Sequence, residues 1–329
     1  SFGTSMAQVR TWGTPPMKSV QFGRFLVGPK VESGSFGTSI HIGRNVKTGE
    51  EVAIKLEQNN SKHPQLLHEC QVYCCLAGGK GLPTVHWCGT EGMHSAMVLQ
   101  LLGPSLGDLL ELCGGTFSMK TVLMFADQLL QRLEYVHDKG FVHRDIKPEN
   151  TLIGLGKNAG TIHLIDFGLA KPYLHPVTHE HLPRKPRGRF TGTARFASLN
   201  AHFGDQSRRD DLEALGYTLL YFLRGNLPWQ GLSASSVEEK NARILEVKAG
   251  ILVEVLCANL PVEFTAFFQY CRRLCFEDRP DYGGLRAMFR GLFERMDYRF
   301  DDVFDWTTLA VQGESDQQQC FGEFECLSL

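Results

Sequence analysis

Apolar residues recur along this chain with two different periods, and the change falls near residue 103. Before it, short runs rich in β-branched and aromatic residues predict strands over 25–31, 39–43, 51–56, 85–87 and 96–102. One stretch in this part, 64–76, has the 3.6-residue period of a helix. We therefore expect a small antiparallel sheet with one helix packed on it.

After Gly103-Pro104 the period becomes helical and stays so. The resulting fold class is α+β with two lobes, a sheet-rich one followed by a mainly helical one. The expected helices cover 121–137, 211–223, 236–249, 262–275 and 282–294. The expected domains are a flexible lead over 1–22, with 1–5 interpreted as an added remnant, an N-lobe over 23–102, a C-lobe over 103–308 and a polar tail over 309–329.

The composition of the chain argues against some classes of binding partner. With 43% hydrophobic residues, 21% charged residues and a net charge of −2, the chain is globular and has no excess charge to attract nucleic acid or an anionic membrane. No apolar run approaches the roughly 20 residues of a membrane span, and no secretory signal opens the chain. We expect a monomer in the cytoplasm, with the nucleus as a second location.

The cysteines fit a reducing compartment. Cys70, Cys74 and Cys75, like Cys271 and Cys275, are spaced at helical intervals within apolar patterns, which predicts buried thiols. The chain contains no CxxC pair, so a structural metal held by cysteines is not expected.

Two short motifs carry the chemistry. His143-Arg144-Asp145-Ile146-Lys147-Pro148-Glu149-Asn150 matches the HRDxxxxN loop, and Asp166-Phe167-Gly168 matches the DFG element of protein kinases. Phosphoryl transfer needs a carboxylate near the attacking hydroxyl, which we assign to Asp145, and hard oxygen ligands for Mg²⁺, which we assign to Asn150 and Asp166. Lys147 is placed to neutralise charge on the γ-phosphate.

Either motif alone would be weak evidence, because three-letter words occur by chance. Their order and spacing, together with the upstream strand Val52-Ala53-Ile54-Lys55, make chance a poor explanation. Lys55 is predicted to hold the α- and β-phosphates of ATP and to pair with an acid on the following helix. Glu69 is that acid in our interpretation, because Glu57 lies too near Lys55 on the same strand.

The glycine-rich loop is incomplete. Gly34 and Gly37 stand where a backbone must approach phosphates closely, but Glu32 occupies the place of the first glycine. Without the downstream motifs, a plain hairpin turn with two glycines would explain this segment equally well. Glu32 is expected to lower ATP affinity without abolishing it, provided that its carboxylate points to solvent.

Four longer motifs add to this pattern: Leu101-Leu102-Gly103-Pro104-Ser105-Leu106, Gly192-Thr193-Ala194-Arg195-Phe196-Ala197-Ser198-Leu199-Asn200, Ser207-Arg208-Arg209-Asp210-Asp211-Leu212-Glu213 and Leu227-Pro228-Trp229-Gln230-Gly231-Leu232. In these motifs the chain resembles the casein kinase 1 family of Ser/Thr protein kinases. Such long motifs make the resemblance specific, and it spans about 25–306.

The resemblance implies ATP bound at a hinge, Mg²⁺ (or Mn²⁺) as the metal, and protein substrates with Ser or Thr in acidic or phosphorylated sequences. It places a primed substrate phosphate on Arg195, Gly231 and Lys240. It implies that the nucleotide contacts Val31, Gly34, Ser35, Phe36, Gly37, Ile40, Ala53, Lys55, Leu99, Gln100, Leu102, Leu152, Ile165 and Asp166, with Leu99 as gatekeeper and 100–102 as hinge. By burial pattern alone, several of these are equally good core residues.

The chain departs from the family before Lys240, where Val237, Glu238 and Glu239 replace further basic residues. We therefore expect a weaker or shifted preference for primed substrates, partly offset by a basic activation segment. The basic residues of that segment are Arg184, Lys185, Arg187 and Arg189. The alternative interpretation is that these four residues simply form the solvated face of a loop.

Two other functions compete with an active kinase. A pseudokinase or scaffold is supported only by Glu32, and a sugar or small-molecule kinase is disfavoured by the long segment from Asp166 to Asn200, which suits a protein substrate. The chain's last four residues, from Cys326, superficially fit a prenylation motif, but Ser328 and the acidic residues upstream disfavour lipidation.

Overall fold

The computed structural model describes residues 20–33, 37–61, 64–184 and 188–309 of the 329-residue chain. Of these, residues 20–67 and 85–101 form one compact unit, and residues 68–84 and 102–309 form a second. Within the described ranges, no helix has both the length and the apolar character needed to cross a bilayer.

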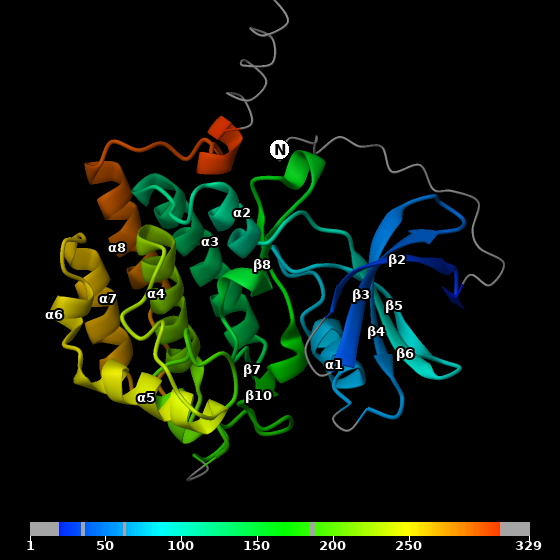
Figure 1. Cartoon of the computed structure of the whole chain (residues 1–329), viewed down its shortest axis with the longest axis horizontal. Coiled ribbons are helices and arrows are strands. Elements are labelled where there is room, and N and C mark those ends of the chain that lie inside the picture. Colours follow the sequence, from blue (N-terminus) through cyan, green and yellow to red (C-terminus); the bar gives the residue numbers. More distant parts are fainter. Residues whose placement is uncertain (1–19, 34–36, 62–63, 185–187, 310–329) are drawn as a thin grey trace, which may run out of the picture. The chain divides into compact units, whose positions relative to one another are not determined.

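The first unit is built on a six-stranded antiparallel sheet, coloured blue to cyan in Figure 1. Its strands lie in the order β1-β2-β3-β4-β6-β5, so β3 and β4 are the central pair and β1 and β5 form the two edges. The strands are β1 (Gln21–Phe22), β2 (Phe25–Ser33), β3 (Thr38–Asn45), β4 (Glu51–Gln58), β5 (Val85–Glu91) and β6 (His94–Gln100).

Alternation along β4 explains how this sheet forms a core. Val52, Ile54 and Leu56 are buried on one face, where they cluster with Phe22 and Phe25. The intervening residues of β4 are half-buried on the opposite face. One face of the sheet thus makes the core, which leaves the other face for side chains with chemical roles.

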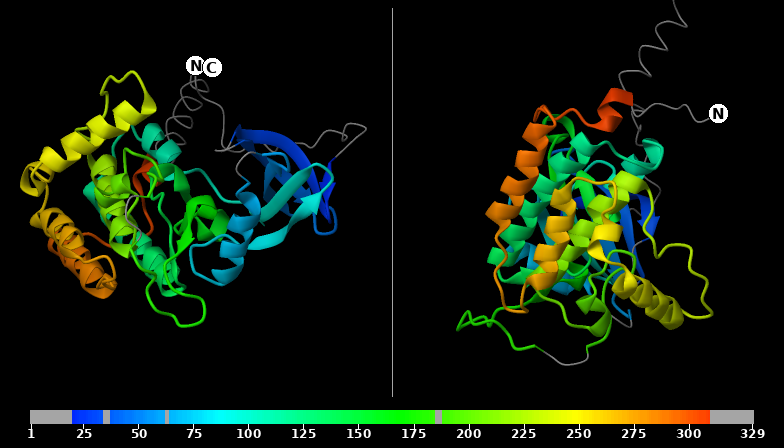
Figure 2. Two further views of the ribbon diagram at one scale, coloured as in Figure 1. Left: turned by 90° about the horizontal axis from the view of Figure 1, so that it is seen from below. Right: turned by 90° about the vertical axis from the view of Figure 1, so that its left-hand side faces the viewer.

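The second unit is helical and is organised around α3 (Met119–Asp138), which packs against α4 (Arg208–Arg224) and α8 (Tyr282–Arg295). Figure 2 shows α5 (Val237–Gly250), in yellow, at one edge of this unit. The other helices are α1 (Leu66–Cys75), α2 (Leu106–Leu112), α6 (Val253–Leu256) and α7 (Val262–Arg273). Two small antiparallel sheets pair β7 (Phe141–Val142) with β10 (Lys171–Pro172) and β8 (Thr151–Ile153) with β9 (Ile162–Leu164).

These elements confirm the predicted α+β fold class with a sheet-rich part before a helical part. The strand expected over 96–102 ends at Gln100, and α2 was not predicted. The helix is short, but its capping box between Ser105 and Asp108 was a readable signal. Expected features within 1–19 and 310–329, including Cys326, lie outside the described residues.

The cysteine prediction is right only in part. Cys271 is buried on α7, as expected, but Cys74, Cys75 and Cys275 are exposed thiols. Helix α7 ends at Arg273, so the helical period no longer governs Cys275. Cys70 is buried but disulfide-bonded, so the prediction of a free thiol there is wrong.

Candidate functional site

The loop that contains the first motif is anchored by a buried carboxylate at the start of α4. Asp211 Oδ2 accepts hydrogen bonds from the backbone N–H of His143 at 2.7 Å and from His137 Nε2 at 2.8 Å, and Oδ1 accepts from the N–H of Arg144 at 2.8 Å. Asp211 is 2% exposed. Despite burial, which opposes it, the contacts with His137 and His143 lower the pKa of Asp211, so the carboxylate stays charged.

Asp145 lies at the centre of a hydrogen-bonded cluster. Its Oδ2 is 2.8 Å from Lys147 Nζ and 3.2 Å from Asn150 Nδ2, and its Oδ1 accepts a 2.8 Å bond from the Thr193 hydroxyl. Lys147 Nζ also donates to Thr193 Oγ1 at 3.3 Å. The structure therefore brings Asp145, Lys147 and Asn150 together as the sequence predicted.

Lys147 is held as an ammonium group. Burial favours the neutral amine, but the charge and hydrogen bond of Asp145, with smaller effects of Glu149 and Asp166, raise the pKa of Lys147 above its ordinary value. A fixed positive charge two residues after a carboxylate can stabilise negative charge that develops on a bound anion.

The two predicted metal ligands lie on backbone segments that are joined by a hydrogen bond. The N–H of Ile165 donates to the carbonyl of Asn150 at 3.0 Å, so Asp166 follows the residue paired with Asn150. Asn150 Nδ2 donates to the backbone carbonyl of Asp145 at 2.9 Å, which orients the amide group. An amide oxygen and a carboxylate are hard donors that suit a divalent cation, so these residues fit such an ion together with phosphate oxygens.

Asp166 has an unusual backbone conformation. Its φ is 63°, in the left-handed region, and its N–H donates to the Tyr73 hydroxyl at 3.2 Å. The next residue, Phe167, is fully buried, with its ring 5.0 Å from that of Tyr73 and 4.9 Å from that of His143. These contacts connect both motifs through one aromatic cluster and hold the backbone of Asp166 and Phe167 in place.

Comparison with protein-family models gives a match to the protein kinase domain over residues 25–282. The chain belongs to the protein kinase family. The match includes both motifs and all the residues of the cluster around Asp145. Kinases of this family transfer a phosphoryl group to proteins and use ATP, which supplies that group, with a divalent metal ion that neutralises its charge.

The kinase's first unit carries most of the predicted nucleotide residues. Lys55 lies on β4 opposite Ile40 of β3 and Met97 of β6, and Ala53 lies directly opposite Leu99 of β6. Ala53, Leu99 and Ile40 are half-buried, on the face of the sheet that does not form the core. The register therefore aligns these residues on neighbouring strands, and Gln100 ends β6 opposite Val52.

The acid predicted to pair with Lys55 is buried in the second unit. Glu69, on α1, is 2% exposed. The rejected candidate, Glu57, accepts hydrogen bonds from the backbone N–H groups of Gln65 at 3.0 Å and Leu66 at 3.2 Å. Both oxygens of Glu57 thus stabilise the start of α1, which gives this carboxylate a structural task.

The glycine-rich loop is described only at its edges. Gly34, Ser35 and Phe36 lie outside the described residues. Gly37 has a φ of 80°, and no atom lies within 4 Å of where its Cβ would be. Glu32, paired with Ile40, is exposed, as is Val31.

The remaining nucleotide residues lie in the second unit beside the motifs. Leu152 on β8 pairs with His163 of β9 and forms a bridge with Ser105, and Ile165 contacts Asn150 through the backbone. Leu102 is half-buried just after the end of β6.

The predicted substrate-phosphate residues are only partly brought together. The Arg195 guanidinium lies over the rings of Phe196 and Tyr221, with its carbon 5.7 and 5.6 Å from their centroids. The Arg195 carbonyl accepts a 2.7 Å bond from Trp229 Nε1, so the turn that contains Gly231 is near it. Lys240 is exposed on α5, and its side chain forms no ion pair within the described part of the chain.

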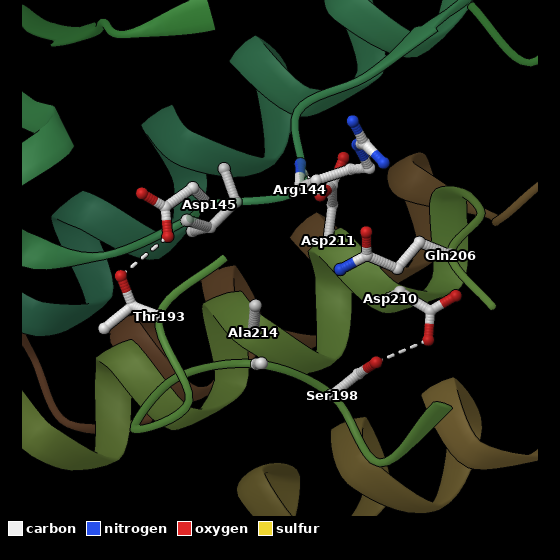
Figure 3. Close-up of a pocket in the computed structure, with 10 residues that line it drawn as sticks. Arg144, Asp145, Thr193, Ser198, Gln206, Asp210, Asp211 and Ala214 are labelled. Atoms are coloured by element: carbon white, nitrogen blue, oxygen red, sulfur yellow. Dashed lines mark hydrogen bonds between the residues drawn. The ribbon is translucent and has the colours of Figure 1, made fainter. Parts of the chain in front are cut away.

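Sequence reasoning missed Thr193 and Asp211 as site residues. Figure 3 shows Thr193 directed at Asp145, and Asp211 behind Arg144. The sequence did contain signals for both residues. Thr193 lies within one of the motifs shared with the casein kinase 1 family, and Asp211 lies at the start of a largely apolar predicted helix. A cavity of about 10 Å³, room for about one water molecule, lies between these residues and Ser198, and is far too small for a nucleotide.

Proposed function

We propose that this kinase is a casein kinase 1-type enzyme that transfers the γ-phosphate of ATP, with Mg²⁺, to Ser or Thr in acidic or phosphorylated protein sequences. Asp145 is the proposed base, Asn150 and Asp166 the metal ligands, and Lys55 the phosphate anchor, with Glu69 as the acid that the sequence predicts for it. The observation that carries the proposal is the contact of Lys147 with both Asp145 and Thr193.

That contact supports a Ser or Thr acceptor through the position of Lys147. A lysine two residues after the catalytic carboxylate fits Ser/Thr kinases, and here Lys147 and Thr193 approach the same carboxylate, one at each oxygen. Asp145 itself is 7% exposed, so these two side chains flank the small part of it that a substrate hydroxyl could reach.

Preference for acidic or primed substrates is supported by Arg195 and by the basic activation segment. Arg184 is exposed, although it pairs with Asp205 at 2.7 Å, and Arg189 is exposed. Lys185 and Arg187 lie outside the described residues. On α5, Glu239 accepts from the N–H of Ser235 at 2.7 Å and from Arg243 at 2.6 Å, so its charge is partly neutralised beside Lys240.

The scaffold alternative rests on Glu32 alone. This side chain is exposed on β2, where a carboxylate remains solvated and repels phosphate only weakly. An active enzyme is therefore the better proposal. A cytoplasmic monomer, with the nucleus as a second location, remains the proposal from the sequence alone.

One experiment tests these points together. Radiolabelled γ-phosphate transfer from Mg²⁺-ATP is measured on peptides that differ only in the acceptor (Ser, Thr or Tyr) and in the residue three places before it (phosphoserine, Asp or Ala). We expect transfer to Ser and Thr, faster with phosphoserine or Asp, and loss of transfer in Asp145→Asn. Transfer to Tyr at a comparable rate, equal rates for all three preceding residues, or full activity of Asp145→Asn would each contradict its part of the proposal.

A further inference from the structure

The segment 193–198 is fastened to the helical unit by side chains that bind its backbone carbonyls. Lys248 Nζ, from α5, donates to the carbonyl of Ala194 at 2.8 Å and to that of Ala197 at 2.5 Å. Trp229 Nε1 donates to the carbonyl of Arg195 between them. The same segment begins with Thr193, whose hydroxyl contacts Asp145.

Lys248 is an unusual residue for this position. It is 1% exposed, and its Nζ lies 4.6 Å from the ring centroid of Tyr217 and 4.7 Å from that of Trp229. Burying an ammonium group costs free energy unless polar partners replace water. Here the partners are two carbonyls and two aromatic faces, so the lysine's favourable contacts are made with the segment and the residues that support it.

The hydrogen bonds from Lys248 to the segment do not require its charge. Burial lowers the pKa of its amine to about 7, a change that Glu213 opposes and Arg272 reinforces. Lys248 also helps to lower the pKa of His202. Above that pH the neutral amine still carries two N–H donors, which is enough for two carbonyls.

We propose that Lys248 is a positioning residue that holds segment 193–198 in the conformation needed to present a protein substrate to Asp145. Lys248 touches neither Asp145 nor the residues predicted to bind the nucleotide, so its effect passes through the segment. Because it contacts the carbonyls on both sides of Arg195 and Phe196, it fixes the path of the backbone there. The inference rests on the proposed role of Asp145 and on this segment as the protein-substrate side of the site.

The test compares three forms of the full chain: the parent, Lys248→Met and Ile244→Ala. Methionine keeps the length and apolar stem of lysine but donates no hydrogen bond, so it leaves two carbonyls unpaired. Ile244 is buried one turn earlier on α5 and has no hydrogen bond to the segment, so its truncation loosens the helix without removing the attachment. Thermal melting of all three establishes that each is folded.

Two readouts are measured. In peptide phosphorylation, we expect Lys248→Met to reduce kcat/KM for the peptide about tenfold, while KM for ATP stays within about twofold of the parent value. For Ile244→Ala, we expect both quantities to stay within about twofold of the parent values. In hydrogen–deuterium exchange, we expect faster exchange in 193–200 for Lys248→Met only. The second readout needs no catalysis, so a parent that transfers no phosphate would defeat the proposed function and still leave the attachment to be judged.

Unchanged exchange in 193–200, unchanged peptide kcat/KM in an active enzyme, or an equal loss of ATP affinity would each overturn the inference. If Lys248→Met does not fold, Lys248→Arg supplies the same measurements. Its guanidinium keeps the donors but is larger, so exchange in 193–200 should rise and kcat/KM should fall part of the way. Parent-like exchange and parent-like kcat/KM in Lys248→Arg would overturn the inference as well.

Discussion

The hydroxyl of Thr193 donates a 2.8 Å hydrogen bond to Oδ1 of Asp145, joining two residues that are 48 positions apart in the sequence. Lys147 and Asn150 occupy the other carboxylate oxygen, at 2.8 and 3.2 Å. A carboxylate held at both oxygens has little freedom to rotate. Asp145 is therefore oriented before any substrate arrives, which is how a preorganised site reduces the cost of catalysis.

Replacing Thr193 with Val tests this relationship. Valine has nearly the same shape but no hydroxyl, so Asp145 Oδ1 loses its donor and gains rotational freedom. We expect kcat to fall roughly tenfold, the equivalent of one hydrogen bond of about 1.4 kcal/mol. The matched control is Thr193→Ser, which keeps the hydroxyl and should stay within about threefold of the parent in steady-state phosphorylation assays. Equal losses in both variants would show that the methyl group, not the hydrogen bond, matters.

The proposed role of Asn150 as a ligand of the divalent metal can be tested by substitution. If its amide oxygen is a metal ligand, Asn150→Ala should raise the Mg²⁺ concentration for half-maximal activity by roughly tenfold or more. The measurement is a Mg²⁺ titration at fixed ATP, repeated with Mn²⁺, and the control is the exposed Asn158→Ala. A lower maximal rate with an unchanged metal dependence would mean that Asn150 acts only through its hydrogen bonds to Asp145.

His202 predicts a pH dependence of stability. Burial, with a smaller effect of Lys248, lowers the pKa of His202 from 6.5 to about 4. Between these values the unfolded chain binds a proton that the folded chain does not, so the free energy of unfolding should decrease as pH falls from about 6.5 to about 4. Because His202 is only half-buried, solvent screening reduces the loss attributable to this residue to on the order of 2 kcal/mol.

The matched variant is His202→Phe, which keeps a ring to stack on Phe190, 5.0 Å away in the parent. Urea denaturation at several pH values between 4 and 7 should show a flatter profile for this variant. Parallel profiles for parent and variant would mean that His202 is protonated equally in the folded and unfolded chain, against the prediction.

The fold class followed from the sequence because the two hydrophobic periods are long and well separated. The strand β4 and the helix α3 fall close to the expected residues for this reason. Short elements escaped. Helix α2 has only seven residues, and β7 and β10 have two each, so no period can develop in them. Their formation depends on tertiary contacts that a local pattern does not contain.

For the site, the sequence predicted the residues with a direct chemical role but not the residues that position them. Asp145 and Asp166 lie in recognisable kinase motifs. The roles of Asp211 and Lys248 depend on backbone groups 67 and 51 residues away, such as the N–H of Arg144 and the carbonyl of Ala197, and backbone groups have no signature in a sequence. Asp211 can be noticed only as a charge at the start of a largely apolar helix, and Lys248 has no comparable signal because α5 is mostly polar.

The anchoring of His143 and Arg144 by Asp211 bears on how this chemistry could be moved elsewhere. Transplanting residues 143–150 into another scaffold would transfer every reactive group of the loop but not the contact that positions the loop. That contact comes from the first turn of α4, where the Asp211 carboxylate binds two consecutive backbone N–H groups. The smallest portable unit of this site is thus two segments more than sixty residues apart, which have to be grafted as a pair.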